Sequence, residues 1–163
     1  MLLAVPAVST DNKSSLIVGR EPATIAVSAS SSYSGWPARN AVDGDTTTSW
    51  YSARDDSAAH GKVPFIQVAF TTPATVRRVT LLGNRDPSYL EGYTILSGKL
   101  ELFDESGRVL ASSSSTGTGN QRDFDFRLPT PVAGVKVVRF SSLDDQGQSN
   151  AYGDVAIAEL QVE

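Results

Sequence analysis

The chain has 163 residues, no cysteine and a net charge of −4, with 14 Lys and Arg against 18 Asp and Glu. This length allows one well-buried core and is short for two, so we expect one folded domain. The lack of cysteine excludes disulfides, zinc–thiolate sites and thiol nucleophiles. Because no basic run exceeds the pair Arg77-Arg78, nucleic acid and an anionic membrane surface are poor partners.

The first 15 residues are expected to lie outside this domain. Residues 1–8 are apolar but lack the basic region and the length of a secretion signal, as in a clipped leader or an expression remnant. Residues 10–15 are polar and are predicted to be disordered. No apolar stretch approaches the roughly 18 residues of a membrane span. The predicted domain therefore comprises residues 16–163.

The pattern of the remaining chain predicts an all-β domain. Short runs rich in Val, Ile, Thr and Phe alternate with clusters of Gly, Pro, Ser, Asp and Asn, and no long segment keeps the apolar period of a helix. The predicted strands are 23–30, 64–70, 76–82, 93–104, 108–112, 124–128, 135–142 and 155–162. About eight such strands indicate a two-sheet antiparallel β-sandwich. A hairpin turn is predicted at 105–107 and a mobile loop at the Ser/Thr/Gly tract 112–119.

The segment 40–50 concentrates hard oxygen ligands. Asp43 and Asp45 flank Gly44, so a bend there turns two carboxylates toward one point, and Thr48 adds a hydroxyl. Oxygen ligands without His or Cys suit calcium. The same residues also fit an Asp-Gly turn capped by threonine hydroxyls, so both interpretations stand. Trp50, which closes the segment, is predicted to anchor the core.

Four segments in this order resemble the discoidin or coagulation factor type C family. They are 19–24, 38–50, 65–70 and 156–162. This family has a galactose-binding-like jelly roll and includes family 32 carbohydrate-binding modules. The resemblance covers nearly all of residues 16–163, and its most specific part is the Asp-Gly-Asp, Thr and Trp pattern combined with an Ala-Glu pair near the carboxyl end.

The resemblance implies a structural calcium ion. Its ligands would be the carbonyls of Asn40 and Ala158, the side chains of Asp43, Asp45 and Thr48, and the carboxylate of Glu159. Glu159 also stands out because it interrupts an apolar final strand. Three carboxylates converging on one buried point repel one another, and a divalent cation compensates for that repulsion. The alternative is a Glu on the solvent face of an edge strand.

The resemblance further implies a shallow sugar pocket in the loops at one end of the sandwich. His60 lies in a long loop, a few residues earlier than in the commonest carbohydrate-module pattern, and an exposed His60 without a ligand fits equally. Arg85 follows a strand end, where its fork of donors matches vicinal hydroxyls, with Asp86 to orient it or to bind the sugar. The alternative is an Arg–Asp surface pair that closes the loop.

Aromatic loop residues are the remaining candidates. A ring that stacks on a sugar must be exposed, which selects Trp36, Tyr89 and Tyr152, although each also fits simple packing against its loop. Tyr33 and Tyr51 are further loop aromatics. Asn150 lies in the polar loop 146–154 that leads into the final strand, where similar modules place pocket residues.

These features predict a non-catalytic carbohydrate-binding module with structural Ca²⁺. No nucleophile-elbow pattern surrounds a serine, and the chain has a single histidine. We expect the domain to be extracellular or at the cell surface, as part of a larger multidomain protein. The alternative is a structural or adhesion module that binds protein or spaces other domains. Phospholipid binding fits poorly, because related membrane-binding domains carry a disulfide and basic loops.

Overall fold

Two long, bent strands, β3 (Phe65–Gly83) and β6 (Phe124–Asp145), organise the fold, and the computed structural model describes residues 25–163. The other strands are β1 (Ile25–Ala29), β2 (Trp50–Tyr51), β4 (Ile95–Phe103), β5 (Val109–Thr116) and β7 (Ala156–Val162). Three short 3-10 helices are η2 (Ala38–Val42), η3 (Ala58–His60) and η4 (Gly147–Ser149). The predicted leader and the segment 19–24 lie outside the described residues. Within those residues, no helix has the length and hydropathy to cross a bilayer.

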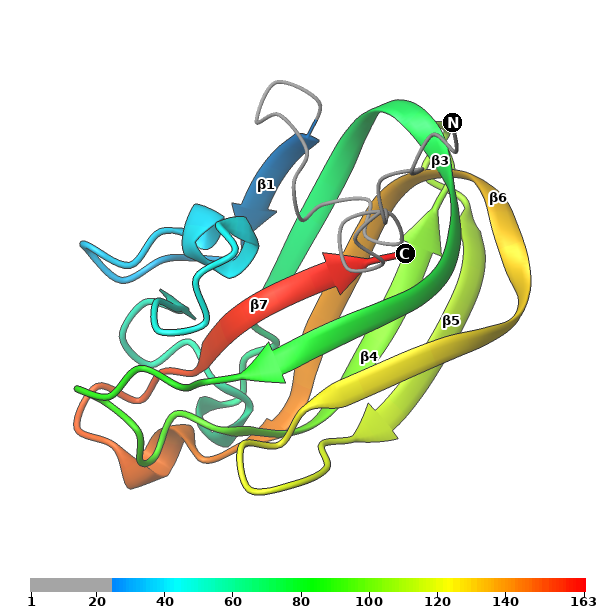
Figure 1. The fold of residues 1–163 in the computed structure, drawn as a ribbon. Helices are drawn as coiled ribbons and strands as arrows, with labels where there is room; N and C mark the ends of the chain where they lie inside the picture. The colour runs from blue at the N-terminus through cyan, green and yellow to red at the C-terminus, as the bar shows by residue number, and fades with distance from the viewer. Residues whose placement is uncertain (1–24) are drawn as a thin grey trace, which may run out of the picture.

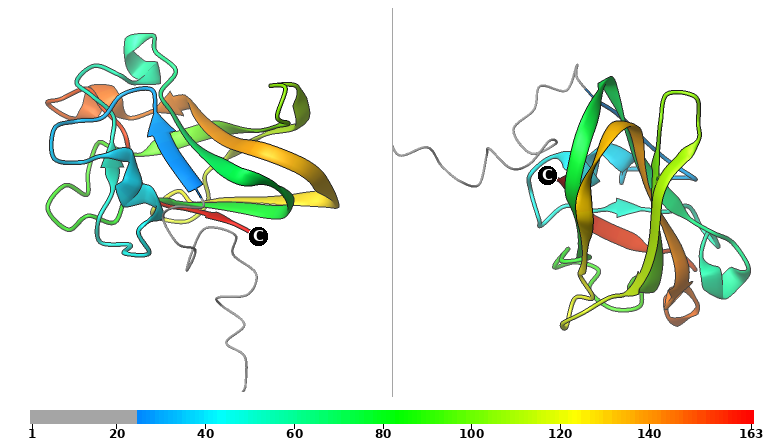
Figure 2. Two further views of the ribbon diagram at one scale, coloured as in Figure 1. Left: turned by 90° about the horizontal axis from the view of Figure 1, so that it is seen from above. Right: turned by 90° about the vertical axis from the view of Figure 1, so that its right-hand side faces the viewer.

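The strands form one continuous antiparallel sheet that folds over into two layers (Figures 1 and 2). The first half of β3 pairs with β1 and with the second half of β6, which continues to β4 and β5. The second half of β3 pairs with the first half of β6 and with β7, which in turn pairs with β2. Register shifts between Ala69 and Arg78 mark the bend in β3. The predicted antiparallel β-sandwich is therefore confirmed.

Several predicted boundaries were wrong because long strands were divided at their bends. The segments 64–70 and 76–82 belong to one strand, β3, and the expected turn between them is a bend inside it. The segments 124–128 and 135–142 likewise form β6. The predicted mobile loop at 112–119 is largely strand, because β5 pairs with β4 as far as Thr116. Its small polar side chains are mostly exposed on an edge strand, so they leave no apolar pattern in the sequence.

The core lies between the two layers. Trp50 is 1% exposed and its Nε1 donates a hydrogen bond to the Ser31 carbonyl at 2.9 Å, so the predicted core anchor is confirmed. The rings of Phe124, Phe126 and Phe140 pack together, with centroids 4.9 to 6.1 Å apart. Phe140 lies directly over Gly98, where an added Cβ would come 2.1 Å from the ring. The glycine thus provides the space that this ring occupies.

Candidate functional site

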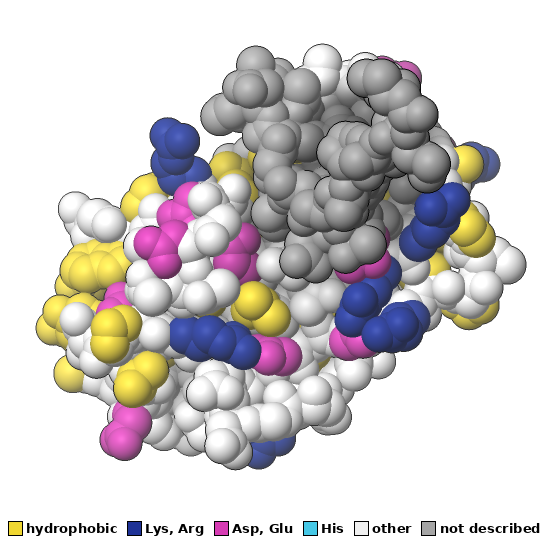
Figure 3. Space-filling view, in the orientation of Figure 1, with side chains coloured by type: hydrophobic (Ala, Val, Ile, Leu, Met, Phe, Trp, Pro, Cys, Tyr) yellow, Lys and Arg dark blue, Asp and Glu magenta, His cyan; other side chains and the backbone are white. Residues whose placement is uncertain are grey.

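The loops at one end of the sandwich bring together segments that are distant in the sequence. The loops β1–β2, β3–β4 and β6–β7 meet there, at the left of Figure 1. Hydrophobic side chains gather at the same end of the surface (Figure 3). Loops that a rigid β-sandwich holds at one end are a common place for a ligand pocket.

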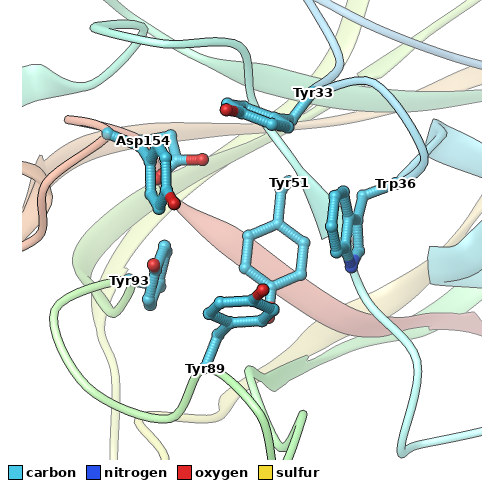
Figure 4. Close-up of a pocket in the computed structure, with 7 residues that line it drawn as sticks. Tyr33, Trp36, Tyr51, Tyr89, Tyr93 and Asp154 are labelled. Atoms are coloured by element: carbon cyan, nitrogen blue, oxygen red, sulfur yellow. The ribbon is translucent and has the colours of Figure 1, made fainter.

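A pocket lined mainly by aromatic rings lies at this end. It spans about 300 Å³ including its open mouth. Its lining residues are Tyr33, Trp36, Tyr51, Tyr89, Tyr93, Tyr152 and Asp154 (Figure 4). Three of the predicted ligand-binding residues, Trp36, Tyr89 and Tyr152, are therefore brought together in one pocket. Their proximity follows from the fold, since they come from three different loops.

The rings hold one another in edge-to-face contacts. Seven ring pairs have centroids 5.2 to 6.2 Å apart and interplanar angles of 68° to 84°. Tyr51 and Tyr93 are buried and Tyr33, Trp36 and Tyr152 are partly buried, whereas Tyr89 is 38% exposed and is the most accessible aromatic residue of the lining. Edge-to-face packing is the favoured arrangement of aromatic pairs and fixes the ring orientations before a ligand arrives. The pocket is thus preorganised.

Asp154 supplies the one carboxylate of the lining. It is 2% exposed, and its Oδ1 atom has no hydrogen-bond partner. Burial raises the pKa of Asp154 to about 6. Burial also raises the pKa of Tyr93, and the charge of Asp154 adds to that shift. A buried carboxylate oxygen without a partner is costly, so this atom is available to a ligand.

Asn150 orders the loop and does not line the pocket. Its Nδ2 donates to the carbonyls of Gly92 and Asp154 at 2.7 and 2.9 Å, and its Oδ1 accepts from the backbone N–H groups of Tyr152 and Gly153. These four bonds use the hydrogen-bonding capacity of the amide. Asn150 was predicted to contact the ligand. In the structure it instead holds the backbone that carries Tyr152 and Asp154.

Arg85 and Asp86 do not act as the predicted pair. Arg85 forms a bidentate ion pair with Asp123, with N–O distances of 2.9 and 2.6 Å, and it does not line the aromatic pocket. Asp86 is buried below the rings and accepts a hydrogen bond from the Tyr51 hydroxyl at 3.2 Å. The partner of Arg85 lies 38 residues away in the chain, so local sequence pointed to the wrong carboxylate. Asp86 instead fixes a ring of the pocket floor.

His60 lies in a polar turn beside the pocket loop. Its Nδ1 is 2.8 Å from Ser57 Oγ and its Nε2 is 3.8 Å from Asp55 Oδ1. This grouping resembles a Ser–His–Asp arrangement in composition only, because Ser57 is fully buried and out of reach of a substrate. His60 is not part of the pocket lining, although an added Cβ at Gly153 would come 2.8 Å from its Cε1.

The predicted calcium segment contacts the final strand. The backbone N–H of Gly44 donates to Glu159 Oε1 at 2.8 Å, which joins the loop to β7 across 115 residues. Glu159 is fully buried and its Oε2 has no hydrogen-bond partner. The pKa of Glu159 is raised to about 8, chiefly by burial and in addition by the nearby Asp43 and Asp45 carboxylates. The alternative of an exposed edge-strand Glu is therefore wrong.

The Asp43 and Asp45 carboxylates lie near Glu159, but the three are not arranged as a metal-binding cluster. Within residues 25–163, no group of three or more His, Cys, Asp and Glu side chains is placed to hold a metal ion. The Asp45 carboxylate instead accepts hydrogen bonds from the N–H and hydroxyl of Thr47 at 2.9 and 2.6 Å. Thr48 Oγ1 lies 2.8 Å from Asp43 Oδ2. These are the turn-capping contacts that we weighed as the alternative.

Asn40 and Ala158 are the two residues predicted to bind calcium through their backbone carbonyls. The pairing of β3 with β7 passes from Leu82–Glu159 to Gly83–Ile157, so the irregularity leaves Ala158 opposite no residue of β3. Asn40 donates from its Nδ2 to the Ser49 carbonyl at 3.1 Å, and this bond orders the loop.

Two residues of the lining escaped the sequence analysis. Tyr93 falls at the start of a predicted strand, and Asp154 precedes the final strand, so both read as structural. The usable signal was the recurrence of Tyr in three loops, since Tyr33, Tyr89 and Tyr152 each belong to a different one. Only the topology indicates that those loops meet.

Comparisons with known proteins agree with this architecture. The model of the F5/8 type C domain matches residues 26–159. A family 32 carbohydrate-binding module from Clostridium perfringens, in complex with GalNAc-β-1,3-galactose, has 15% identity and a TM-score of 0.65, with 85% of this chain and 94% of that chain covered. A second one from the same organism, in complex with galactose, has 18% identity and a TM-score of 0.61, with coverages of 85% and 92%.

A third similar structure is chitosan-binding module 1 of a chitosanase/glucanase from Paenibacillus sp. IK-5. It has 24% identity and a TM-score of 0.63, with 86% of this chain and 95% of that chain covered. No curated protein has significant sequence similarity to this chain.

Proposed function

Because the chain belongs to the F5/8 type C domain family, we propose that it is a non-catalytic carbohydrate-binding module whose ligand enters the aromatic pocket. The main support for this proposal is the preorganised pocket of six rings, in which the partly exposed Tyr89 would stack on the face of a sugar. Rings that stack on a sugar and a few fixed polar groups are the usual elements of such a site.

The similar structures support this class of ligand. Their complexes contain GalNAc-β-1,3-galactose and galactose, and one is a chitosan-binding module. A shallow pocket of this kind favours weak binding at one site, strengthened by neighbouring copies or domains. We therefore propose an extracellular or cell-surface setting, as one domain of a larger protein.

We also propose a structural calcium ion between the segment 40–50 and β7. The fit is supported by the buried Glu159 Oε2 atom without a partner and by the adjacent Asp43 carboxylate. The ligands would be the carbonyls of Asn40 and Ala158 with the side chains of Asp43, Asp45, Thr48 and Glu159. The ion would offset the repulsion among the Asp43, Asp45 and Glu159 carboxylates. It would thereby link an early loop to the last strand.

Tyr89→Ala is expected to weaken glycan binding by about fivefold or more, because stacking of one ring contributes on the order of 1 kcal/mol or more. The measurement is a glycan array followed by calorimetry on the glycans that bind. Tyr89 is the best position, since its exposure limits the effect on stability.

Arg85→Ala is the matched control, because Arg85 is a predicted ligand residue that does not line the aromatic pocket. Binding that survives in Arg85→Ala and fails in Tyr89→Ala supports the aromatic pocket. The opposite result moves the site to Arg85. A wild-type protein that binds no neutral, acidic or basic glycan favours the structural or adhesion module instead.

A further inference from the structure

The aromatic pocket has a charge property that a neutral sugar does not use. Six rings and one carboxylate surround the same space, and the Asp154 carboxyl group points towards it (Figure 4). The faces of aromatic rings attract cations that lie within about 6 Å of the ring centroid. A carboxylate among such rings provides the opposite full charge.

Asp154 is not explained by contacts within the protein. Its Oδ1 atom is buried without a partner, although Asn150 binds the backbone of Tyr152, Gly153 and Asp154 around it. Arg54 is the cationic residue whose charge acts on Asp154, but its guanidinium packs over the Tyr152 ring, 5.8 Å from the centroid. It also lies 3.5 Å from the Ala151 carbonyl. A cation from outside the chain would give Asp154 its missing partner.

We propose that the pocket binds an organic ammonium group, with the rings as its cage and Asp154 as its counter-ion. In the setting of the proposed carbohydrate function, on which this step rests, the group is the ammonium of a 2-amino-2-deoxy sugar. A hydroxyl or an acetamide donates a hydrogen bond to Asp154 but leaves its charge uncompensated. An alkylammonium that is not part of a sugar offers the same chemistry.

The proposed ammonium site is tested by NMR-monitored ligand titrations near neutral pH. The ligands are glucosamine, N-acetylglucosamine and glucose, which differ only in the substituent on one carbon, and tetramethylammonium, a cation without a sugar. Glucosamine is expected to bind about tenfold more tightly than either neutral sugar, as about 1.4 kcal/mol of charge interaction requires. Asp154→Asn is expected to lose this preference. Asp144→Asn, which removes an equal charge from an exposed position, is expected to retain it.

Stability distinguishes binding from a structural role. If the Asp154 carboxylate has a structural role, Asp154→Asn lowers the melting temperature. If it is a ligand-binding group, the substitution removes an uncompensated buried charge, and the melting temperature is expected to stay equal or to rise. If Asp154→Asn does not fold, the carboxylate is structural. Equal binding of the three sugars by the wild type independently overturns the proposed ammonium site.

The two proposals fail separately. Equal affinity for glucosamine and glucose, unchanged in Asp154→Asn, overturns the ammonium site and leaves the carbohydrate function standing. Binding of tetramethylammonium by the wild type but not by Asp154→Asn, without binding of any sugar, supports the ammonium site and contradicts the carbohydrate function. Binding of neither class overturns both.

Discussion

Removal of calcium is expected to lower the melting temperature by about 5 to 10 °C. A ligand at a hundred times its dissociation constant adds about 2.7 kcal/mol to the free energy of unfolding, and extracellular sites of this type bind at about 0.1 to 1 mM. In a domain of this size, each kcal/mol corresponds to about 2 to 4 °C. The comparison is a thermal melt in about 10 mM calcium, a hundred times the tighter of these dissociation constants, and in excess chelator.

Glu159→Gln is expected to abolish this dependence on calcium. Glutamine keeps an oxygen that accepts from the Gly44 N–H but lacks the charge that the ion requires. Glu91→Gln is the matched control, because Glu91 is exposed and distant in sequence from the proposed ligands. An unchanged melt in chelator, with absence of metal verified analytically, would rule out the calcium site, and the turn contacts of Asp43 and Asp45 would then account for the segment.

Phe140→Ala is expected to lower the free energy of unfolding by about 3 to 5 kcal/mol, as the removal of a buried ring does elsewhere. Phe140 is fully buried, contacts the rings of Phe124 and Phe126, and covers Gly98. No nearby side chain fills the resulting space without moving the sheet, since Gly98 has none. Chemical denaturation measures the change.

Val109→Ala is the control for this measurement, because Val109 is 48% exposed and lies on the edge strand β5. Its effect is expected to stay within about 0.5 kcal/mol. A loss below about 1 kcal/mol in Phe140→Ala would contradict the packing described for the core.

Local patterns predicted the elements well but misjudged their continuity. In the predicted strand 64–70, Ile66, Val68 and Phe70 alternate with other residues and all three are buried, because burial of alternate residues is a local property. The bend inside β3 looked like a turn, since Thr71-Thr-Pro-Ala74 has the composition of one. Pairing with β6 keeps this segment in the sheet, and that pairing involves residues about 60 positions away.

The candidate site shows the same division. The choice of Trp36, Tyr89 and Tyr152 was possible because exposed aromatic loop residues are unusual. The roles of Arg85 and Asn150 were not predictable, because Arg85 pairs with Asp123 and Asn150 bonds to Gly92 across the loops. A side chain binds whichever group the fold brings near it, and sequence spacing does not report that group.

The sequence by itself determined the all-β class and the core position of Trp50, because both depend on residue type and short-range pattern. The link between the segment 40–50 and Glu159 spans 115 residues and was implied by the family resemblance. Only the tertiary structure decided where the ligand pocket lies. Its rings come from loops separated by up to about a hundred residues, and the buried Asp154 acquires its meaning from the rings around it. Proximity of this kind arises from sheet topology and packing, which no single segment encodes.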